Sequence, residues 1–241
     1  LKGAEKRFFQ TKETEELYDI KTDPHEVNNL AGDPKFRDVL KRMRKAQIAW
    51  AVDIHDTGFL PEGEFIARSE GSTPFEMVRD PKKYDQAALM AAADVANARD
   101  AKNLPRLVEM LGDKDSGVRY WGAIGCLSLG DKAGPAGGVL TKALGDSCPN
   151  VRISAAESLC SMGKNDKALG VLIEALGHSN DRVTLHAANA LDYLGEKARP
   201  ALEAMKKAKG DGYTQRTLRW ALEELGEKLP APAKKPRRKK K

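Results

Sequence analysis

The sequence is poor in the residues that most often bind metals, transfer protons or form cross-links. Its 241 residues include three cysteines and four histidines, and only 6% are aromatic. The cysteines show no C-x-x-C spacing and the histidines do not cluster, so the sequence indicates neither a zinc site nor a redox pair. Core or turn positions are the expected places for the cysteines. These residues are Cys126, Cys148, Cys160, His25, His55, His178 and His186.

Long apolar runs and targeting signals are also absent from the sequence. No apolar stretch reaches the roughly 18 residues of a transmembrane helix, and no signal peptide opens the chain. The first residue is Leu1 rather than methionine, and it precedes a segment that reads as a strand. We therefore expect a fragment of a longer protein, whose compartment the missing signals do not decide.

A basic surface on the body of the protein is not indicated either. The net charge is +6 at pH 7, but residues 234–241 alone supply seven positive charges, which leaves about −1 for the rest of the chain. Residues 229–241 contain proline and like charges without apolar periodicity, and we expect them to form a disordered basic tail. The tail has no interleaved aromatic residues, so nucleic acid is not the expected partner.

A thirteen-residue block occurs four times, and the rest of the sequence is organised around it. Mostly apolar residues at its fifth, ninth and twelfth positions are four and three residues apart, which places them on one face of a helix. The thirteenth residue is always glycine, as expected for a left-handed C-cap. The closing glycines are 33, 32 and 31 residues apart, a period typical of stacked repeats. The blocks are Val118–Gly130, Val151–Gly163, Val183–Gly195 and Thr214–Gly226.

A shorter helix is expected before each block, since apolar residues recur there at three- and four-residue steps. Such an αα-hairpin is too small to bury its own apolar face, and it is stabilised by stacking on its neighbours. With the Asp-x-x-x-x-Val-Arg pattern in the turns, this arrangement resembles HEAT repeats over about residues 84–226. The helix predicted over residues 84–99 is expected to cap the stack. The expected first helices are Asn103–Leu111, Pro135–Leu144, Lys167–Leu176 and Ala198–Lys207.

The first two repeat turns carry matching charges. Asp113 and Arg119 are six residues apart, as are Asp146 and Arg152, whereas the third and fourth repeats have neither member. Because an unpaired, half-buried partner is costly, this joint loss predicts a ladder of Asp–Arg hydrogen bonds, in which Asp146 can bridge both arginines. The alternative is unrelated surface charges that were lost by chance.

The first 80 residues follow a different pattern. Lys6–Gln10 and Glu16–Ile20 are predicted to form a β-hairpin, because aromatic and β-branched residues flank a polar connection. Asp33 and Pro34 then begin a helix that is predicted to run to about Ile54. Its apolar stripe is expected to contain Phe36, Leu40, Met43, Ala46, Trp50 and Ile54.

Three motifs in this segment, taken in order, resemble the C-terminal end of sulfatases of the alkaline-phosphatase-like superfamily. They are ELYD at Glu16–Asp19, the D-P-x-E-x-x-N-L run at Asp23–Leu30 before the long helix, and DTGFLPEGE at Asp56–Glu64. The resemblance implies a parent sulfuric ester hydrolase that acts on sulfated carbohydrate and is periplasmic or secreted. It also implies that the missing N-terminal sulfatase domain of the same polypeptide is a partner of this segment.

The residues that this resemblance requires for catalysis are missing from the chain. The family uses a Cys or Ser in a C/S-x-P-S-R motif, oxidised to formylglycine, together with a calcium ion. No such motif occurs, and Cys148–Arg152 has the wrong spacing. No catalytic, cofactor-binding or metal-binding residue is therefore assigned, and calcium and formylglycine are implied only for the missing domain. His55 and Asp56, on the loop after the long helix, are candidates for reaching a substrate held by that domain. A helix C-cap and turn is the alternative for them.

We therefore predict a mostly α fold: a HEAT-like solenoid over residues 82–228, preceded by a small α+β sulfatase-like segment over 1–60 and a linker over 61–81. The predicted function is a non-catalytic C-terminal segment of a sulfatase, with the solenoid as a scaffold or as a surface for a protein or sulfated glycan. The alternatives are a stand-alone HEAT-repeat binding protein, a HEAT-like lyase, or a binder of polyanions through the basic tail.

Overall fold

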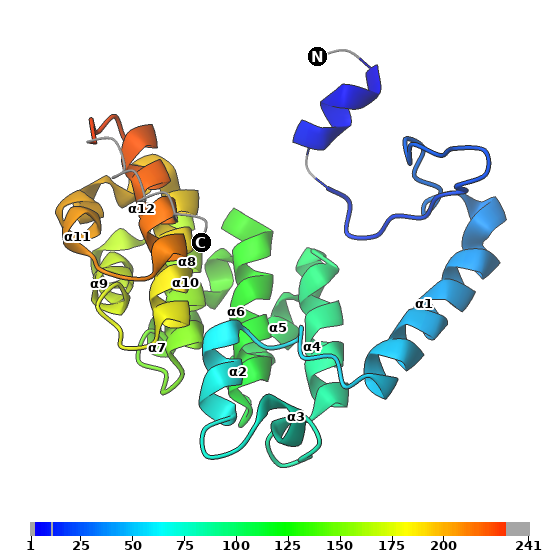
Figure 1. The fold of residues 1–241 in the computed structure, drawn as a ribbon, viewed down its shortest axis with the longest axis horizontal. Coiled ribbons are helices and arrows are strands. Elements are labelled where there is room, and N and C mark those ends of the chain that lie inside the picture. The colour runs from blue at the N-terminus through cyan, green and yellow to red at the C-terminus, as the bar shows by residue number, and fades with distance from the viewer. Residues whose placement is uncertain (1–2, 11, 230–241) are drawn as a thin grey trace, which may run out of the picture.

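The computed structural model describes residues 3–10 and 12–229, and these residues form α-helices and short 3₁₀-helices (Figure 1). Of the predicted basic tail, only Leu229 is among them, so that prediction lies outside the described residues. None of the helices described is long and apolar enough to cross a membrane. The α-helices are α1 (Arg37–Asp53), α2 (Glu62–Arg68), α3 (Pro74–Met77), α4 (Gln86–Asn97), α5 (Leu104–Met110), α6 (Ser116–Leu129), α7 (Gly137–Ala143), α8 (Pro149–Ser161), α9 (Asn165–Ala175), α10 (Asp181–Leu194), α11 (Leu202–Lys207) and α12 (Gly212–Glu224). The 3₁₀-helices are η1 (Gly3–Phe9), η2 (Pro34–Phe36), η3 (Ala101–Asn103), η4 (Gly130–Ala136) and η5 (Gly195–Ala201).

The repeats form a helical solenoid, as the period predicts. The second helices α6, α8, α10 and α12 pack in succession, each also against the first helix of its own hairpin, and α4 packs on α6 at the start of the stack. Positions five, nine and twelve of every block are buried, except Met162, which is partly buried. All four closing glycines have positive φ, between 51° and 86°, a conformation that glycine adopts without a steric penalty. The predicted helical register is confirmed.

The predicted β-hairpin is wrong for this chain, because no strand occurs among the described residues. Lys6–Phe9 belongs to the 3₁₀-helix η1, and its two phenylalanines are exposed. Residues 15–20 are irregular, and they contact the following turn. The Leu17 amide donates to the Asn29 side chain at 2.9 Å, and the Leu30 amide donates to the Leu17 carbonyl at 2.8 Å. A two-stranded hairpin is marginal without further strands to pair with, and the described part of the chain offers none.

The long helix after this segment forms as predicted, but its apolar stripe is largely uncovered. Asp33 caps the 3₁₀-helix η2, which leads into α1, by accepting a hydrogen bond from the Lys35 amide. Helix α1 then extends away from the repeats (Figure 1). Only Leu40 and Ala51 are buried along α1. Trp50 is 62% exposed and Met43 52% exposed, so one face of α1 is left uncovered by the other residues that the structure describes.

The segment over 61–81, predicted to be a linker, instead contains α2 and α3 and packs against the repeats. Thr73 and Glu76 form a capping box at the start of α3, and Met77 is fully buried. In α2, Gly63 and Glu64 are buried. The Gly/Pro-rich composition was misleading because these residues serve as helix starts and close-approach positions rather than as a flexible connector.

Candidate functional site

Helix α2 lies across the N-terminal ends of the second helices α6, α8 and α10. We call the surface formed by α6, α8, α10 and α12 the second-helix face. A Cβ atom on Gly63 would approach Asn150 of α8 and Val183 of α10 to 2.9 Å, so glycine is required for this close contact. Just before α2, the Trp121 indole of α6 donates to the Phe59 carbonyl at 2.9 Å. The sulfatase-like part is therefore attached directly to this face.

A buried network of charges anchors α2. Arg68 donates to Glu64 at 2.8 Å, to both oxygens of Asp115 at 2.6 and 3.1 Å, and to the Lys83 carbonyl at 2.8 Å. Ser116, the first residue of α6, also donates to Glu64. Burial opposes ionisation of Glu64, but the hydrogen bonds from Ser116, Cys148 and Arg68 outweigh it, so the pKa of this carboxyl is lowered. Because every charge has a partner, the network joins α2 to the first repeat turn.

The cysteines have the structural roles expected for them. All three are free and buried. The Cys148 thiol donates to Glu64 at 3.0 Å, and burial together with the Glu64 charge raises its pKa to about 12. A thiol with such a pKa remains protonated at neutral pH and is a poor nucleophile.

The Asp–Arg ladder runs diagonally between repeats rather than within one. Arg119 donates to both carboxylate oxygens of Asp146, at 2.7 and 2.8 Å, and to the main-chain carbonyls of Asp113 and Lys114, at 2.9 and 3.0 Å. Burial opposes ionisation of Asp146, but the hydrogen bonds from Arg119 and the Cys148 amide hold the pKa of this carboxyl below its ordinary value. Arg119 therefore binds both the main chain of its own turn and the carboxylate of the next turn.

Arg152 does not bond to the Asp146 carboxylate. The Asp146 carboxylate therefore does not form the predicted bridge between the two arginines. The Arg152 guanidinium donates instead to the Asp146 main-chain carbonyl at 2.9 Å. In the third repeat Thr184 takes over this contact and donates to the His178 carbonyl at 3.0 Å. The carboxylate that Arg152 would need belongs to the position of His178, where the sequence has no acid.

His55 and Asp56 lie at the turn that follows α1. His55 has a φ of 53°, and the Asp56 amide donates to the Ala51 carbonyl at 2.9 Å. The Asp56 side chain accepts from the Gly58 amide at 2.9 Å, and its main-chain carbonyl accepts from the Tyr84 hydroxyl. These contacts describe the helix end and turn that the sequence left as the alternative.

The structure brings together a set of polar side chains that the sequence did not single out. On the second-helix face, Asn150 contacts the His186 ring nitrogen at 2.9 Å, and the rings of Tyr120 and His186 lie 6.1 Å apart. Glu157 is buried beside Tyr120, and burial raises its pKa to about 7. Burial also lowers the pKa of His186 to about 4, so both groups tend to be neutral. One feature of the sequence could have pointed to this set. The seventh block position is apolar in the first repeat (Ile124) but is the acidic Glu157 in the second.

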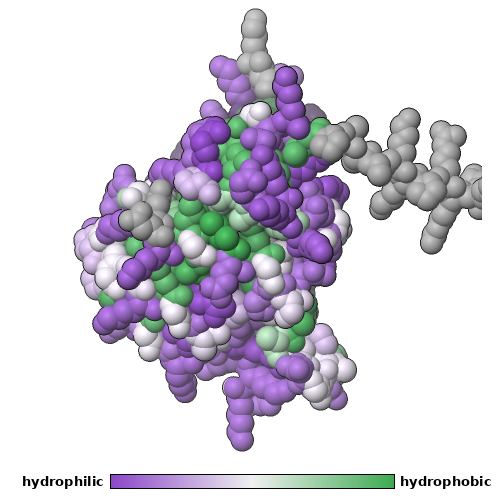
Figure 2. All heavy atoms as spheres, turned by 90° about the vertical axis from the view of Figure 1, so that its left-hand side faces the viewer, coloured by the Kyte–Doolittle hydropathy of each residue, from purple (hydrophilic) through white to green (hydrophobic). Residues whose placement is uncertain are grey.

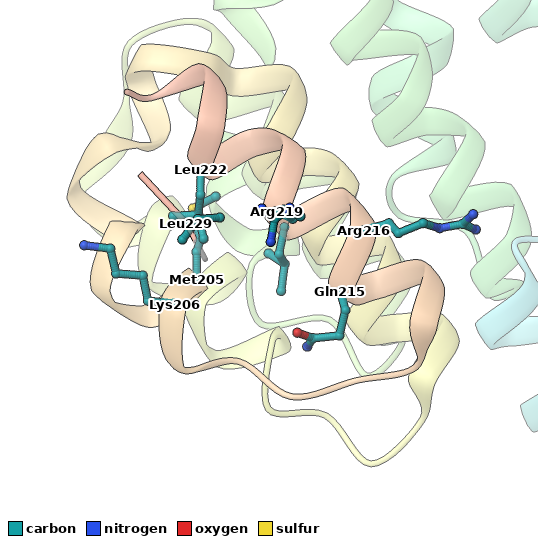
Figure 3. Close-up of a pocket in the computed structure, with 8 residues that line it drawn as sticks. Met205, Lys206, Gln215, Arg216, Arg219, Leu222 and Leu229 are labelled. Carbon is teal, nitrogen blue, oxygen red and sulfur yellow. The ribbon is translucent and has the colours of Figure 1, made fainter. Parts of the chain in front are cut away.

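Two of the cavities near the last repeats are lined in part by residues of α12. One, of about 750 Å³, is a groove between α2 and the starts of α10 and α12. The other, of about 450 Å³, lies between α11 and α12, over an apolar floor that includes Met205 and Leu222 (Figure 3). Arg216 extends away from the other labelled side chains of this second cavity (Figure 3). At this end of the molecule, apolar side chains gather among hydrophilic ones (Figure 2).

Comparisons with known proteins agree with the two-part organisation. A family model for HEAT repeats matches residues 138–223. The ulvan-active sulfatase of Formosa agariphila is 40% identical over 76 residues, which are 31% of this chain and 13% of that protein. Human N-sulphoglucosamine sulphohydrolase is 46% identical over 41 residues, which are 17% of this chain and 8% of that protein. The chain joins a sulfatase-like segment to HEAT-like repeats.

The matched stretches cover only a small part of the sulfatases, about an eighth of one and a twelfth of the other. Among solved structures, an engineered protein is similar with a TM-score of 0.40 and 20% identity, covering 68% of this chain and 79% of that one. A designed armadillo repeat protein in complex with the peptide (KR)4 has a TM-score of 0.41 and 17% identity, with 80% and 95% covered.

Proposed function

We propose that this chain is the non-catalytic C-terminal segment of a sulfatase, a sulfuric ester hydrolase acting on sulfated carbohydrate, and that its repeats are a binding surface held beside the enzyme. The observation that carries the proposal is the docking of α2. The Glu64–Arg68–Asp115 network attaches the chain that follows the sulfatase-like segment to the first repeat turn. A solenoid held in this way keeps one orientation relative to that segment, as a substrate-presenting or partner-presenting module requires.

The uncovered face of α1 supports the sulfatase half of the proposal. Met43, Trp50 and Ile54 are spaced seven and four residues apart, and each is about half exposed or more. A contiguous apolar face of this kind marks an interaction surface. We assign this face to the body of the sulfatase, because the sulfatase relatives match this chain over only a short stretch of their own length.

The chemistry belongs, on this proposal, to the parent enzyme and not to this chain. The sequence has no C/S-x-P-S-R motif. The described part of the chain brings together no group of three or more His, Cys, Asp or Glu side chains that could hold a metal ion. Calcium and formylglycine are proposed for the sulfatase body, and an exported location is proposed for the whole enzyme.

The experiment is to read the transcript that encodes Leu1 and to translate it upstream in the same frame. We expect a C/S-x-P-S-R motif a few hundred residues earlier. An in-frame stop codon followed by a start codon directly before Leu1 would contradict the proposal. As a second measurement, the chain alone should not hydrolyse aryl sulfates in the presence of calcium, whereas the protein that includes the upstream motif should.

A further inference from the structure

The larger of the two cavities is formed jointly by the two parts of the chain. Leu60 and Phe65 contribute apolar surface from the α2 side, and Leu185 contributes it from α10. Glu62, Arg182 and Tyr213 line the same groove. Its volume of about 750 Å³ lies within the range of roughly 300–1,000 Å³ that is usual for small-molecule sites.

Tyr213 presents an open aromatic ring at this groove. It is 58% exposed, although it is the second residue of α12 and belongs to a packed repeat. Two guanidinium groups lie over the ring, Arg216 at 4.7 Å and Arg182 at 5.9 Å from its centroid. The ring and the two arginines thus form one surface that combines an apolar plane with positive charge.

The two arginines differ in how firmly they are engaged. Arg182 is shared between Glu62 at 3.3 Å and Asp211 at 3.5 Å, both longer than an optimal charged hydrogen bond. Glu62 is 70% exposed, and exposed pairs of this kind contribute little, so an incoming anion can replace it. Arg216 is exposed and contacts Tyr213. Both guanidinium groups are therefore available to an oxyanion.

The polar groups of the groove suit a sugar better than a simple anion. A saccharide presents C–H faces that pack on an aromatic ring and hydroxyls that donate to carboxylates, and a sulfate group presents several acceptors to the arginine forks. We infer that the groove between α2 and α12 binds a sulfated saccharide, with the sugar ring on Tyr213 and the sulfate on Arg216 and Arg182. This inference rests on the proposed function, because it takes the bound carbohydrate to belong to the substrate class of the parent enzyme. Glu62, released from Arg182, would accept hydrogen bonds from the sugar hydroxyls.

The test is calorimetric titration of the full chain with a heparin-derived tetrasaccharide and with the same tetrasaccharide after desulfation. All proteins carry a tail in which the seven basic residues of 234–241 are replaced by serine, so that the tail does not contribute. We expect Tyr213→Ala and Arg216→Gln each to weaken binding about tenfold, the effect of one charged hydrogen bond or stacking contact. Tyr213→Phe should bind normally, because it keeps the ring.

Two matched controls separate the groove from general surface effects. Tyr193→Ala removes an 81% exposed tyrosine on α10, and Arg106→Gln removes an exposed arginine on α5; both should leave affinity unchanged. Three results would each overturn the inference: equal affinity for the desulfated sugar, equal affinity of Tyr213→Ala and the protein with the intact groove, or no binding by the protein with the intact groove and the serine tail. Preferred binding of a peptide or nucleic acid at Tyr213 would overturn it too. The proposed function is tested separately, by translation of the sequence upstream of Leu1. A negative titration would therefore contradict the saccharide site without contradicting the sulfatase proposal.

Discussion

Arg119 and Asp146 are 27 residues apart in sequence, yet they form a two-pronged ion pair that joins the turns of successive repeats. Both side chains are only 14% and 10% exposed, so solvent screens this pair less than it screens an ordinary surface pair. The arginine also binds two main-chain carbonyls of its own turn. The pair therefore joins the turn of the first repeat to the turn of the second.

A double-mutant cycle of Arg119→Ala and Asp146→Ala should give a coupling free energy of about 1–3 kcal/mol, as expected for a partly buried charged hydrogen bond. Chemical denaturation with a far-ultraviolet circular dichroism signal measures each variant. The exposed pair of Arg106 and Glu109 provides the control, with an expected coupling of about 0.5 kcal/mol or less. Additive effects of the Arg119 and Asp146 substitutions would mean that the pair does not hold the turns together.

Replacing Arg68 by lysine should loosen α2 from the repeats. A lysine ammonium cannot serve Glu64, Asp115 and the Lys83 carbonyl together, so buried acceptors lose partners, and we expect a loss of about 3 kcal/mol in the free energy of unfolding. Limited proteolysis should then cut within residues 58–72. Arg44→Lys, in the exposed pair with Glu15, should change stability by less than about 1 kcal/mol. Unchanged proteolysis of the Arg68 variant would argue against the anchoring role.

Glu157 should make the protein less stable as the pH rises. Its folded-state pKa of about 7 lies above the ordinary value of 4.5, so the folded protein binds the proton more tightly, and stability falls between about pH 4.5 and 7. His186 has the opposite slope between about pH 6.5 and 4, because its folded-state pKa is lowered to about 4. Glu157→Gln should therefore be more stable than the unsubstituted chain at pH 8, by up to about 3 kcal/mol. At pH 4 the two proteins should have nearly the same free energy of unfolding.

The matched control for this substitution is Glu174→Gln, at an exposed position of α9. This substitution makes the same chemical change at the surface of the neighbouring helix. Melting temperatures measured between pH 4 and 8 for the three proteins decide the matter. A constant offset for Glu157→Gln at all pH values would show that the carboxyl titrates normally.

Leu191→Ala should cost about 2–5 kcal/mol, because Leu191 is fully buried between repeats and truncation leaves a cavity. Trp50→Ala, although it removes a larger side chain, should change stability by no more than about 0.5 kcal/mol, since that indole is 62% exposed. Denaturation midpoints of the two variants make the comparison. A large loss for Trp50→Ala would mean that the face of α1 is covered within this chain.

The repeats could be predicted from the sequence because the signals that specify them are local. Apolar residues at fixed steps define the buried face, and glycines such as Gly163 end each second helix, so residues a few positions apart contain the information. The sulfatase-like motifs could likewise be read in order along the chain. The hairpin could not be predicted correctly, because strand formation at Glu16–Ile20 depends on further strands to pair with, and the described residues contain none.

Contacts between distant segments were decided only by the tertiary structure. The sequence singled out Arg119, Asp146 and Arg152 and suggested that the Asp146 carboxylate could bridge both arginines. The stacking of the repeats gives that carboxylate to Arg119 of the preceding turn, and Arg152 binds only the Asp146 main chain. Docking of α2 likewise turns a Gly/Pro-rich stretch into an anchored helix and creates the groove at Tyr213. Local periodicity determines which face of a helix is buried. Which side chains meet across helices depends on how the repeats stack, and no short-range pattern encodes that geometry.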